Sequence, residues 1–537
     1  MLAKYKTEIF FFLTLVAGIV ILYPFVDYQA IMATGDHGRD LYAARVALEG
    51  HVPYRDYWWV YGPLMPYYYA LFFKALGIHV PALLAGKMLL TLLSALLIFG
   101  ALVAATVSPA LSLIGALWFL TFFPDFFITY NHTGGIFLLL AVAYCLLRYL
   151  IEQRIFLLYL GLAGVFLLAL VKVSFGLTTL FCLLAAAFTI DRVYKHPFDR
   201  QKQILFFSAA VIVPGVIFLI YWMLLKGLPV YAIRQCLPYL GDDQPYHVPL
   251  ATGTLMLMQS ILQNVGATLP NVLFAIMITG AGAQSIRILI DPRNEKHLRT
   301  HLLLAIGICV LFYVVNLQEF LVSGVFYRSL WAKPFAYLLM FIVLGVGTRR
   351  LPQGMRVGLY TILGLVLGLQ MVNTQRYMSA VKVPSQYLGV ERGKVFLGNE
   401  APWIATVTQT VSYLETNLRK DELFFALPYD PLYYFLTDKI SPTRQLIFFD
   451  HIKIPPEQEK AILADLEKNK VNWIVLTSRQ HATKEYGLGI LGKTYCPLIG
   501  EYIEKNFSTV VQFGDWINEP GWAGNHGTRI LKRKQAP

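Results

Sequence analysis

The chain has 537 residues, of which 57% are hydrophobic and 14% are charged, and its formal net charge is +13. Average soluble chains carry about 25% charged residues, so this composition excludes an ordinary soluble protein and indicates an integral membrane protein. The basic residues are spread over separate loops rather than gathered in one patch, which argues against nucleic acid as a partner.

Apolar stretches of roughly 20 residues, long enough to cross a bilayer core of about 30 Å, recur along the chain. The first, from about Ile9 to Val26, follows Lys4 and Lys6 and has no small-residue cleavage pattern after it, which indicates a retained anchor. Together the stretches predict a polytopic α-helical membrane protein with about eleven transmembrane helices and its termini on opposite sides. The other spans are expected near 82–106, 109–124, 133–150, 155–171, 174–190, 203–225, 268–288, 301–317, 332–348 and 356–374.

Basic residues in short loops predict the orientation, because Lys and Arg are enriched on the cytoplasmic side. Threading eleven spans places the N-terminal lysines and the basic turns near 148–154, 192–202, 287–299 and 349–356 on one face. We therefore predict a multi-pass protein of a bacterial inner (plasma) membrane with a cytoplasmic N-terminus. The opposite face, which is periplasmic or extracellular (or lumenal in a eukaryote), receives a first outer loop at 27–80 and the C-terminal portion.

The composition divides the chain into a membrane module, residues 1–375, and a C-terminal domain, residues 376–537. Alternating strand and helix patterns in the second part predict a small soluble α/β domain with a largely parallel sheet. It lacks the glycine-rich nucleotide-binding motifs, and we expect it to stabilise the protein or orient an acceptor. Strands are expected at Leu423–Pro428, Leu446–Phe449 and Trp473–Thr477, helices over 403–418, 456–469 and 497–506, and an edge pair at Val510–Phe513 and Thr528–Leu531.

The first outer loop gathers ionisable side chains beside the membrane, where they are costly to keep and are candidates for function. The pattern over Asp40–Glu49 predicts an amphipathic helix, with Asp36 just ahead of it. Asp36 could cap that helix, or it could act as a base or ligand facing a cavity. The two aspartates share a face only if the helix extends back to Asp36, and the sequence leaves this open.

Further along this loop, Tyr54–Trp59 combines an Arg55–Asp56 ion pair with aromatic rings that include Tyr57. An aromatic belt at the membrane interface would explain the rings without any function. Rings also stack on sugar faces, so a carbohydrate site is the alternative. A Gly-Pro turn then leads into a helix predicted over Leu64–Leu76.

Three other outer segments carry isolated polar residues. Lys172 stands alone between two apolar spans, and Arg328 has Glu319 nearby. The long side chain of each cation either extends to the membrane interface without a functional role, or it binds a phosphate at the outer leaflet. Asp125 and His132 bracket the second outer loop, and a lone histidine is more often structural than a ligand.

Several motifs together resemble the C-type glycosyltransferases, which are polytopic enzymes of the GT-C fold that use polyprenyl-phosphate sugars. The segments are GDHGRDLYAARVALEGHVPYRDY, YGPLMPYYYALFFKALG, ALVKVSFG and LPYDPLYYFLTDKISPTR. Within this family the chain is most similar to the bacterial branch related to the protein O-mannosyltransferases and the lipid A aminoarabinose transferases. The resemblance covers almost the whole chain.

The resemblance implies that a sugar moves from a polyprenyl monophosphate to an envelope lipid, glycan or protein by direct, usually inverting, displacement. Asp36 would be the catalytic carboxylate, and Lys172 and Arg328 would hold the lipid phosphate. Candidate residues for the acceptor and the sugar are Asp40, Arg55, Asp56, Tyr57, Asp125 and His132.

The chain also departs from the family pattern. Related enzymes often have Asp-Glu at the first-loop position, an acidic residue before the fourth span and a glycine after the motif lysine. Here those places hold His37, Asn131 with His132, and Val173. The departures argue against a metal role, as does the absence of Cys/His metal spacing, so no cofactor is expected. Two alternatives stay open: a lipid-linked saccharide flippase or transporter, and a polymer ligase of the O-antigen-ligase type that uses a lipid diphosphate.

Overall fold

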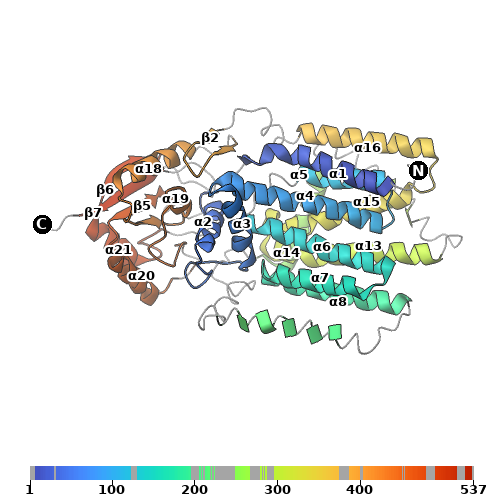
Figure 1. Cartoon of the computed structure of the whole chain (residues 1–537), viewed down its shortest axis with the longest axis horizontal. Helices are drawn as coiled ribbons and strands as arrows, with labels where there is room; N and C mark the ends of the chain where they lie inside the picture. The colour runs from blue at the N-terminus through green and yellow to red at the C-terminus, as the bar shows by residue number, and fades with distance from the viewer. Residues whose placement is uncertain are drawn as a thin grey trace.

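The structure is a computed structural model with two parts, a bundle of helices and a mixed α/β portion stacked on one end of it (Figure 1). The N-terminus lies at the end of the bundle away from the α/β portion. The structure describes residues 6–29, 32–122, 130–194, single residues and short runs within 205–223 and 279–286, and residues 248–266, 296–373, 386–398, 403–449, 452, 454–478, 490–516 and 527–534.

In the described part of the chain, nine bundle helices coincide with predicted spans. They are α1 (Lys6–Leu22), α4 (Val80–Ala104), α5 (Pro109–Phe122), α6 (Tyr130–Glu152), α7 (Ile155–Ala169), α8 (Val173–Tyr194), α13 (Lys296–Asn316), α15 (Lys333–Gly347) and α16 (Gln353–Asn373). The spans predicted near 203–225 and 268–288 fall largely outside the described residues. The helix α11 (Leu250–Gly266) lies between the spans predicted near 203–225 and 268–288, where the sequence predicts no span.

The outer surface of the bundle is apolar. Side chains such as Phe12, Val20, Phe181 and Leu365 are 58–64% exposed on their helices, which suits contact with lipid tails rather than water. Among the described helices, five are long and apolar enough to cross a membrane. They are Lys6–Phe25, Val80–Ala104, Tyr130–Glu152, Val173–Tyr194 and His297–Ser323. The structure thus has the polytopic helical architecture that the sequence predicts.

The first outer loop forms two short helices between the bundle and the α/β portion (Figure 1). The helix α3 (Leu64–Leu76) has the predicted bounds, and Gly77 follows it with a positive φ of 97°. The helix α2 runs from Asp36 to Leu48, so it begins four residues before the predicted start. Short helices follow the bundle elements at η1 (Tyr23–Phe25), α14 (Gln318–Ser323) and η2 (Phe326–Trp331).

The main sheet of the C-terminal portion has the strand order β4-β5-β7-β6. Its strands are β4 (Phe424–Leu427), β5 (Trp473–Thr477), β6 (Phe507–Phe513) and β7 (Thr528–Arg533). Its helices are α18 (Ile404–Asn417), α19 (Leu432–Leu436), α20 (Pro456–Lys468) and α21 (Pro497–Asn506), of which α18, α20 and α21 agree with the predicted helical segments.

Two predictions for this sheet are wrong. Only β4 and β5 pair in parallel, whereas β5–β7 and β6–β7 are antiparallel, because the last strand, β7, lies between β5 and β6 and runs opposite to both. The apolar run Leu446–Phe449 is not a strand. It is buried beside β4, where the Phe448 N–H donates to the Pro428 carbonyl at 3.0 Å.

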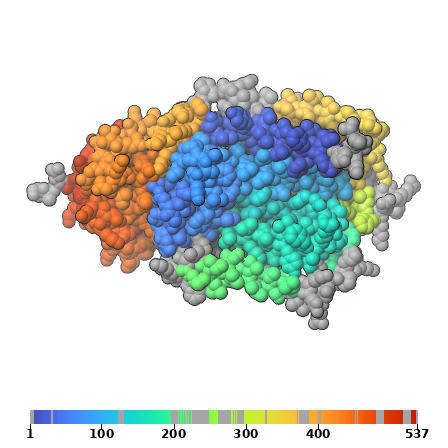
Figure 2. Space-filling model, in the orientation of Figure 1, coloured from blue at the N-terminus to red at the C-terminus, as the bar shows by residue number. Residues whose placement is uncertain are grey.

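A second, three-stranded sheet joins the first outer loop to the C-terminal portion. Its order is β1-β3-β2, with β1 (Tyr28–Gln29), β2 (Gln386–Leu388) and β3 (Val395–Leu397). Because β1 pairs in parallel with β3, Tyr28 lies opposite Phe396. Figure 2 shows the same close association on the surface, where the first outer loop abuts the C-terminal portion.

Gly38 allows α2 to pack against α19. A Cβ atom on Gly38 would lie 2.5 Å from the Leu432 nitrogen and 2.8 Å from its Cα, both backbone atoms. We expect Gly38→Ala to lower the unfolding temperature, since overpacking costs about 1–3 kcal/mol. Thermal unfolding in nanodiscs measures this. Gly354→Ala is the matched control, because a Cβ there meets nothing within 4 Å, and equal stability of the two variants would contradict the packing.

Candidate active site

The N-terminal turn of α2 carries three charged side chains in contact. Since the helix begins at Asp36 with Gly35 as its N-cap residue, Asp36 and Asp40 do share a face, and Arg39 bridges them. The Arg39 Nη1 atom lies 3.3 Å from Asp36 Oδ1, and its Nη2 atom lies 2.9 Å from Asp40 Oδ1. A carboxylate in the first turn of a helix is also favoured by the helix dipole.

The two aspartates differ in exposure and therefore in what they can do. The Asp40 side chain is 3% exposed, accepts two hydrogen bonds from Arg39 and accepts another from the Asn131 N–H. Burial raises the pKa of Asp40 to about 6, although Arg39 acts in the opposite direction. The Asp36 side chain is 35% exposed. Asp40 thus joins α2 to α6, whereas Asp36 remains accessible to a substrate.

The first outer loop is hydrogen-bonded to the turn that precedes Lys172. The Gly62 N–H donates to the Val171 carbonyl at 2.8 Å, and the Leu64 N–H donates to the Leu170 carbonyl at 2.9 Å. A Cβ atom on Gly62 would lie 2.1 Å from the Leu170 oxygen, so this close approach requires glycine. The backbone thereby brings the lysine motif to the loop that carries Asp36.

Lys172 forms an ion pair with Glu319 at the start of α14. The Lys172 Nζ atom lies 2.7 Å and 2.9 Å from the two carboxylate oxygens, and Ser174 Oγ donates to the same carboxylate at 3.4 Å. Lys172 is 18% exposed, whereas the Glu319 side chain is 9% exposed. The lysine is therefore held by a protein carboxylate and is still partly accessible.

Tyr61 connects the Lys172 pair to the charges on α2. The Arg39 guanidinium carbon lies 4.9 Å from the centre of the Tyr61 ring, and Lys172 Nζ lies 5.7 Å from the same centre. Such positions favour cation–π attraction. The ring thus places the Asp36–Arg39 pair and Lys172 in one site.

His132 lies on another side of the Tyr61 ring. Its ring packs edge-on against Tyr61 at 5.3 Å and against Trp331 at 5.1 Å. Lys172 Nζ lies 5.9 Å from the centre of the same Trp331 ring, and Arg328 belongs to the short helix η2 that carries Trp331. The structure therefore brings together Lys172, Arg328 and His132, which the sequence places far apart, whereas Asp125 lies outside the described residues.

Arg55 and Asp56 form the predicted ion pair, with 2.7 Å between Arg55 Nη2 and Asp56 Oδ2. The Asp56 carboxylate also accepts the Val52 N–H at 2.7 Å. The hydrogen bond from Arg55 holds the pKa of Asp56 below its usual range. These contacts stabilise a turn in the loop itself.

The aromatic residues of this loop are interior groups. Tyr54, Tyr57, Trp58 and Trp59 are each 1–2% exposed. The backbone N–H of Trp58 donates to the Arg444 carbonyl at 2.8 Å, and the Trp58 ring packs edge-on against Tyr429 at 6.5 Å. The rings thus fill the junction with the C-terminal portion, and none of the four faces the surrounding lipid or water.

Glu319 and Tyr429 are site residues that sequence reasoning did not select. Glu319 has a sequence signal, because it is the only acidic residue between Glu295 and Glu391. Tyr429 lies in the segment LPYDPLYYFLTDKISPTR that carries the family resemblance, but nothing in the sequence pairs it with Asp36, 393 positions away. Within the described ranges, no group of three or more His, Cys, Asp or Glu side chains could hold a metal ion.

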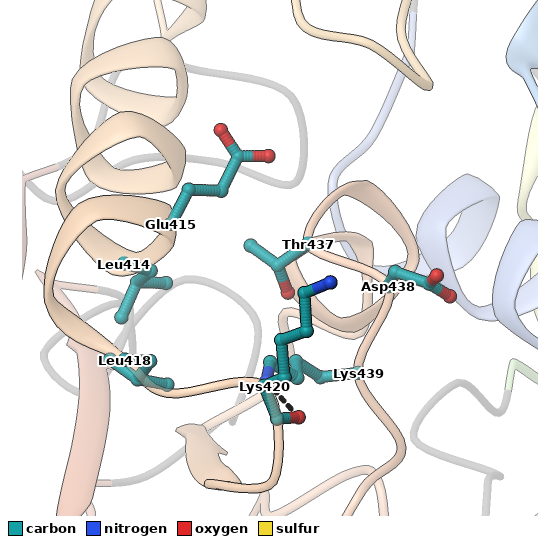
Figure 3. A pocket seen from close by; sticks show the side chains of 7 residues that line it. All are labelled: Leu414, Glu415, Leu418, Lys420, Thr437, Asp438 and Lys439. Carbon is teal, nitrogen blue, oxygen red and sulfur yellow. Dashed lines mark hydrogen bonds between the residues drawn. The ribbon is translucent and has the colours of Figure 1, made fainter.

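A cavity of about 450 Å³ lies elsewhere, between α18 and the end of α19 (Figure 3). Two of its charged groups are engaged: Lys439 donates to the Arg419 and Lys420 carbonyls at 2.8 Å each, and Asp438 pairs with Arg45 at 2.7 Å. The cavity is separate from the cluster around Asp36. It is lined by Leu414, Glu415, Leu418, Lys420, Thr437, Asp438 and Lys439.

The fold and this cluster define a class of protein: a polytopic helical membrane protein with charged groups gathered where the bundle meets a C-terminal α/β portion. No protein-family model matches the chain, and no curated protein matches it. Two crystal structures of ArnT from Cupriavidus metallidurans are similar to it, each at 13% identity over 97% of both chains. The TM-score is 0.48 for the structure bound to undecaprenyl phosphate and 0.49 for the apo structure. ArnT is a lipid A aminoarabinose transferase of the GT-C fold.

Proposed function

We propose that this protein is a membrane glycosyltransferase that moves a sugar from a polyprenyl-monophosphate donor to an acceptor of the cell envelope. Asp36 activates or orients the acceptor hydroxyl group. Lys172, together with Arg328, holds the phosphate of the lipid donor. The acceptor is a lipid, a glycan or a protein.

The observation that carries this proposal is the Tyr61 ring, which has the Asp36–Arg39 pair on one side and Lys172 close by. Lys172 Nζ and the Arg39 guanidinium both lie within 6 Å of the ring centre. A partly exposed carboxylate and a partly exposed cation therefore belong to one site at the end of the bundle. Direct displacement at a sugar carbon needs such a pair, a base for the nucleophile and a cation for the leaving group.

The proposed step balances as follows. The acceptor oxygen bonds to the anomeric carbon of the sugar, and the bond from that carbon to the phosphate oxygen breaks. The acceptor proton moves to the Asp36 carboxylate. The polyprenyl phosphate leaves with one more negative charge, which Lys172 and Arg328 offset. Attack on the face opposite the phosphate inverts the anomeric configuration.

The transporter alternative predicts charges at the middle of the bundle, where substrate sites of transporters lie. The ion pairs around Asp36 and Lys172 lie instead at the end of the bundle that meets the C-terminal portion. Their position favours chemistry at the membrane surface.

Sugar transfer by the purified protein tests the proposal. We would supply undecaprenyl-phosphate hexoses and pentoses, labelled in the sugar, to proteoliposomes with an extract of envelope lipids and glycans. We expect label in the extract and release of undecaprenyl phosphate from at least one of these donors. Undecaprenyl-diphosphate sugars are the matched comparison, and transfer from these alone would overturn the monophosphate assignment. Movement of intact donor across the bilayer without transfer would favour the transporter instead.

A further inference from the structure

The carboxyl ends of the parallel strands β4 and β5 face the first outer loop. Asp430, three residues after β4, accepts a hydrogen bond from Thr477 at the end of β5 at 2.7 Å. Its other carboxylate oxygen accepts a bond from Thr34 of the first outer loop at 2.8 Å. Open α/β sheets bind ligands at the carboxyl ends of their strands. In this protein the start of α2 lies at these carboxyl ends.

Tyr429, next to Asp430, reaches the proposed base directly. The Tyr429 hydroxyl donates to Asp36 Oδ1 at 2.9 Å and accepts a bond from Arg39 Nη1 at 3.1 Å. Arg39 also contacts the same Asp36 oxygen at 3.3 Å. Among the residues that the structure describes, Asp36 Oδ2 receives no hydrogen bond. One oxygen is thus held by two donors, while the other is left for the acceptor hydroxyl.

Burial makes this arrangement rigid. Tyr429 is fully buried and Arg39 is 1% exposed, so both donors are fixed by packing, whereas the Asp36 side chain is partly open. A Cβ atom on Gly35 would lie 2.6 Å from the Tyr429 ring. The backbone before Asp36 therefore lies directly against this tyrosine.

We propose that Tyr429 is a positioning residue for the reaction, through which the C-terminal domain sets the orientation of the Asp36 carboxylate. The inference rests on the proposed function. It also assigns the C-terminal domain a direct part in the active site, beyond stabilising the fold or orienting an acceptor. A catalytic group that is displaced by about 1 Å can lose roughly 100-fold in rate.

The test is Tyr429→Phe, which removes the hydroxyl group and keeps the ring. With the labelled undecaprenyl-phosphate sugar that serves as donor for the wild type, we expect kcat to fall about 10- to 100-fold. The KM for that donor should stay within about twofold, because Lys172 is untouched. Tyr433→Phe is the matched control, since its buried hydroxyl bonds Thr528 at 2.9 Å in the same domain.

Wild-type kcat in Tyr429→Phe, or an equal fall in Tyr433→Phe, would overturn the inference. Asp36→Asn measured in parallel separates the two proposals. If Asp36→Asn is inactive while Tyr429→Phe is fully active, the positioning role alone fails. If Asp36→Asn is fully active, the base assignment fails, and the positioning role fails with it.

Discussion

Asp36→Asn is expected to lower the rate of sugar transfer by about 10²–10⁴-fold, which is the usual contribution of a positioned general base. The amide keeps the size of the carboxylate but cannot take the acceptor proton. Folding should be little affected, because Arg39 retains its closer bonds to Asp40, at 2.9 Å and 3.1 Å. Transfer from the labelled undecaprenyl-phosphate sugar measures the rate, and thermal unfolding checks the fold.

The control for Asp36→Asn is Asp421→Asn, which removes the same charge from a side chain that is 80% exposed on the C-terminal domain. We expect this variant to transfer at the wild-type rate. Should Asp36→Asn also transfer at that rate, another group must activate the acceptor.

Replacing Lys172 has the second largest expected effect, and its ion pair with Glu319 must be taken into account in the test. Hydrogen bonds to charged groups contribute about 1.5–3 kcal/mol, so Lys172→Ala should weaken donor use by roughly 10- to 150-fold. The same substitution leaves the buried Glu319 carboxylate without its cation, which is itself destabilising. The single variant therefore mixes a functional and a structural effect.

A double-mutant cycle separates the two effects of Lys172. Glu319→Gln alone should leave donor use near the wild-type level, since Lys172 keeps its charge. The double variant, Lys172→Ala with Glu319→Gln, should regain stability but remain defective with the donor. Lys74→Ala, at an exposed position of α3, controls for loss of a positive charge from the outer loop. Recovery of donor use in the double variant would show that Lys172 serves only the ion pair.

The sequence predicted a helix or strand of this fold well where the residues of that segment alone determine its structure. The helix α3 has the predicted bounds because Gly62 and Pro63 form a turn ahead of it and Gly77 adopts a positive φ after it. The bundle helices follow from apolar stretches of sufficient length. The sequence left the start of α2 open, because the first turn of this helix packs against Leu432 and Tyr429, which lie far away in the sequence.

Predictions that depend on distant partners were harder. The apolar run Leu446–Phe449 has the composition of a strand but does not form one, although its Phe448 N–H bonds the Pro428 carbonyl beside β4. The rings of Tyr54–Trp59 suggested a membrane belt or a sugar site because the sequence does not reveal that Arg444 and Tyr429 cover them. Asp36 was selected from the charge cluster of the first outer loop and through the family resemblance, and Lys172 as a lone cation between apolar spans, whereas Tyr61 looks like an ordinary aromatic residue.

The pairing of β1 with β3 has a consequence for how the protein is made. Tyr28 emerges at the start of synthesis, and its partner Phe396 follows hundreds of residues later. At translation rates of 5–20 residues per second, the wait is roughly 20–75 s. During that time most of the membrane helices can insert, while the first outer loop remains without its partner strand. The catalytic centre of the proposed enzyme is therefore assembled late, after Phe396 and Tyr429 in the last third of the chain have been synthesised.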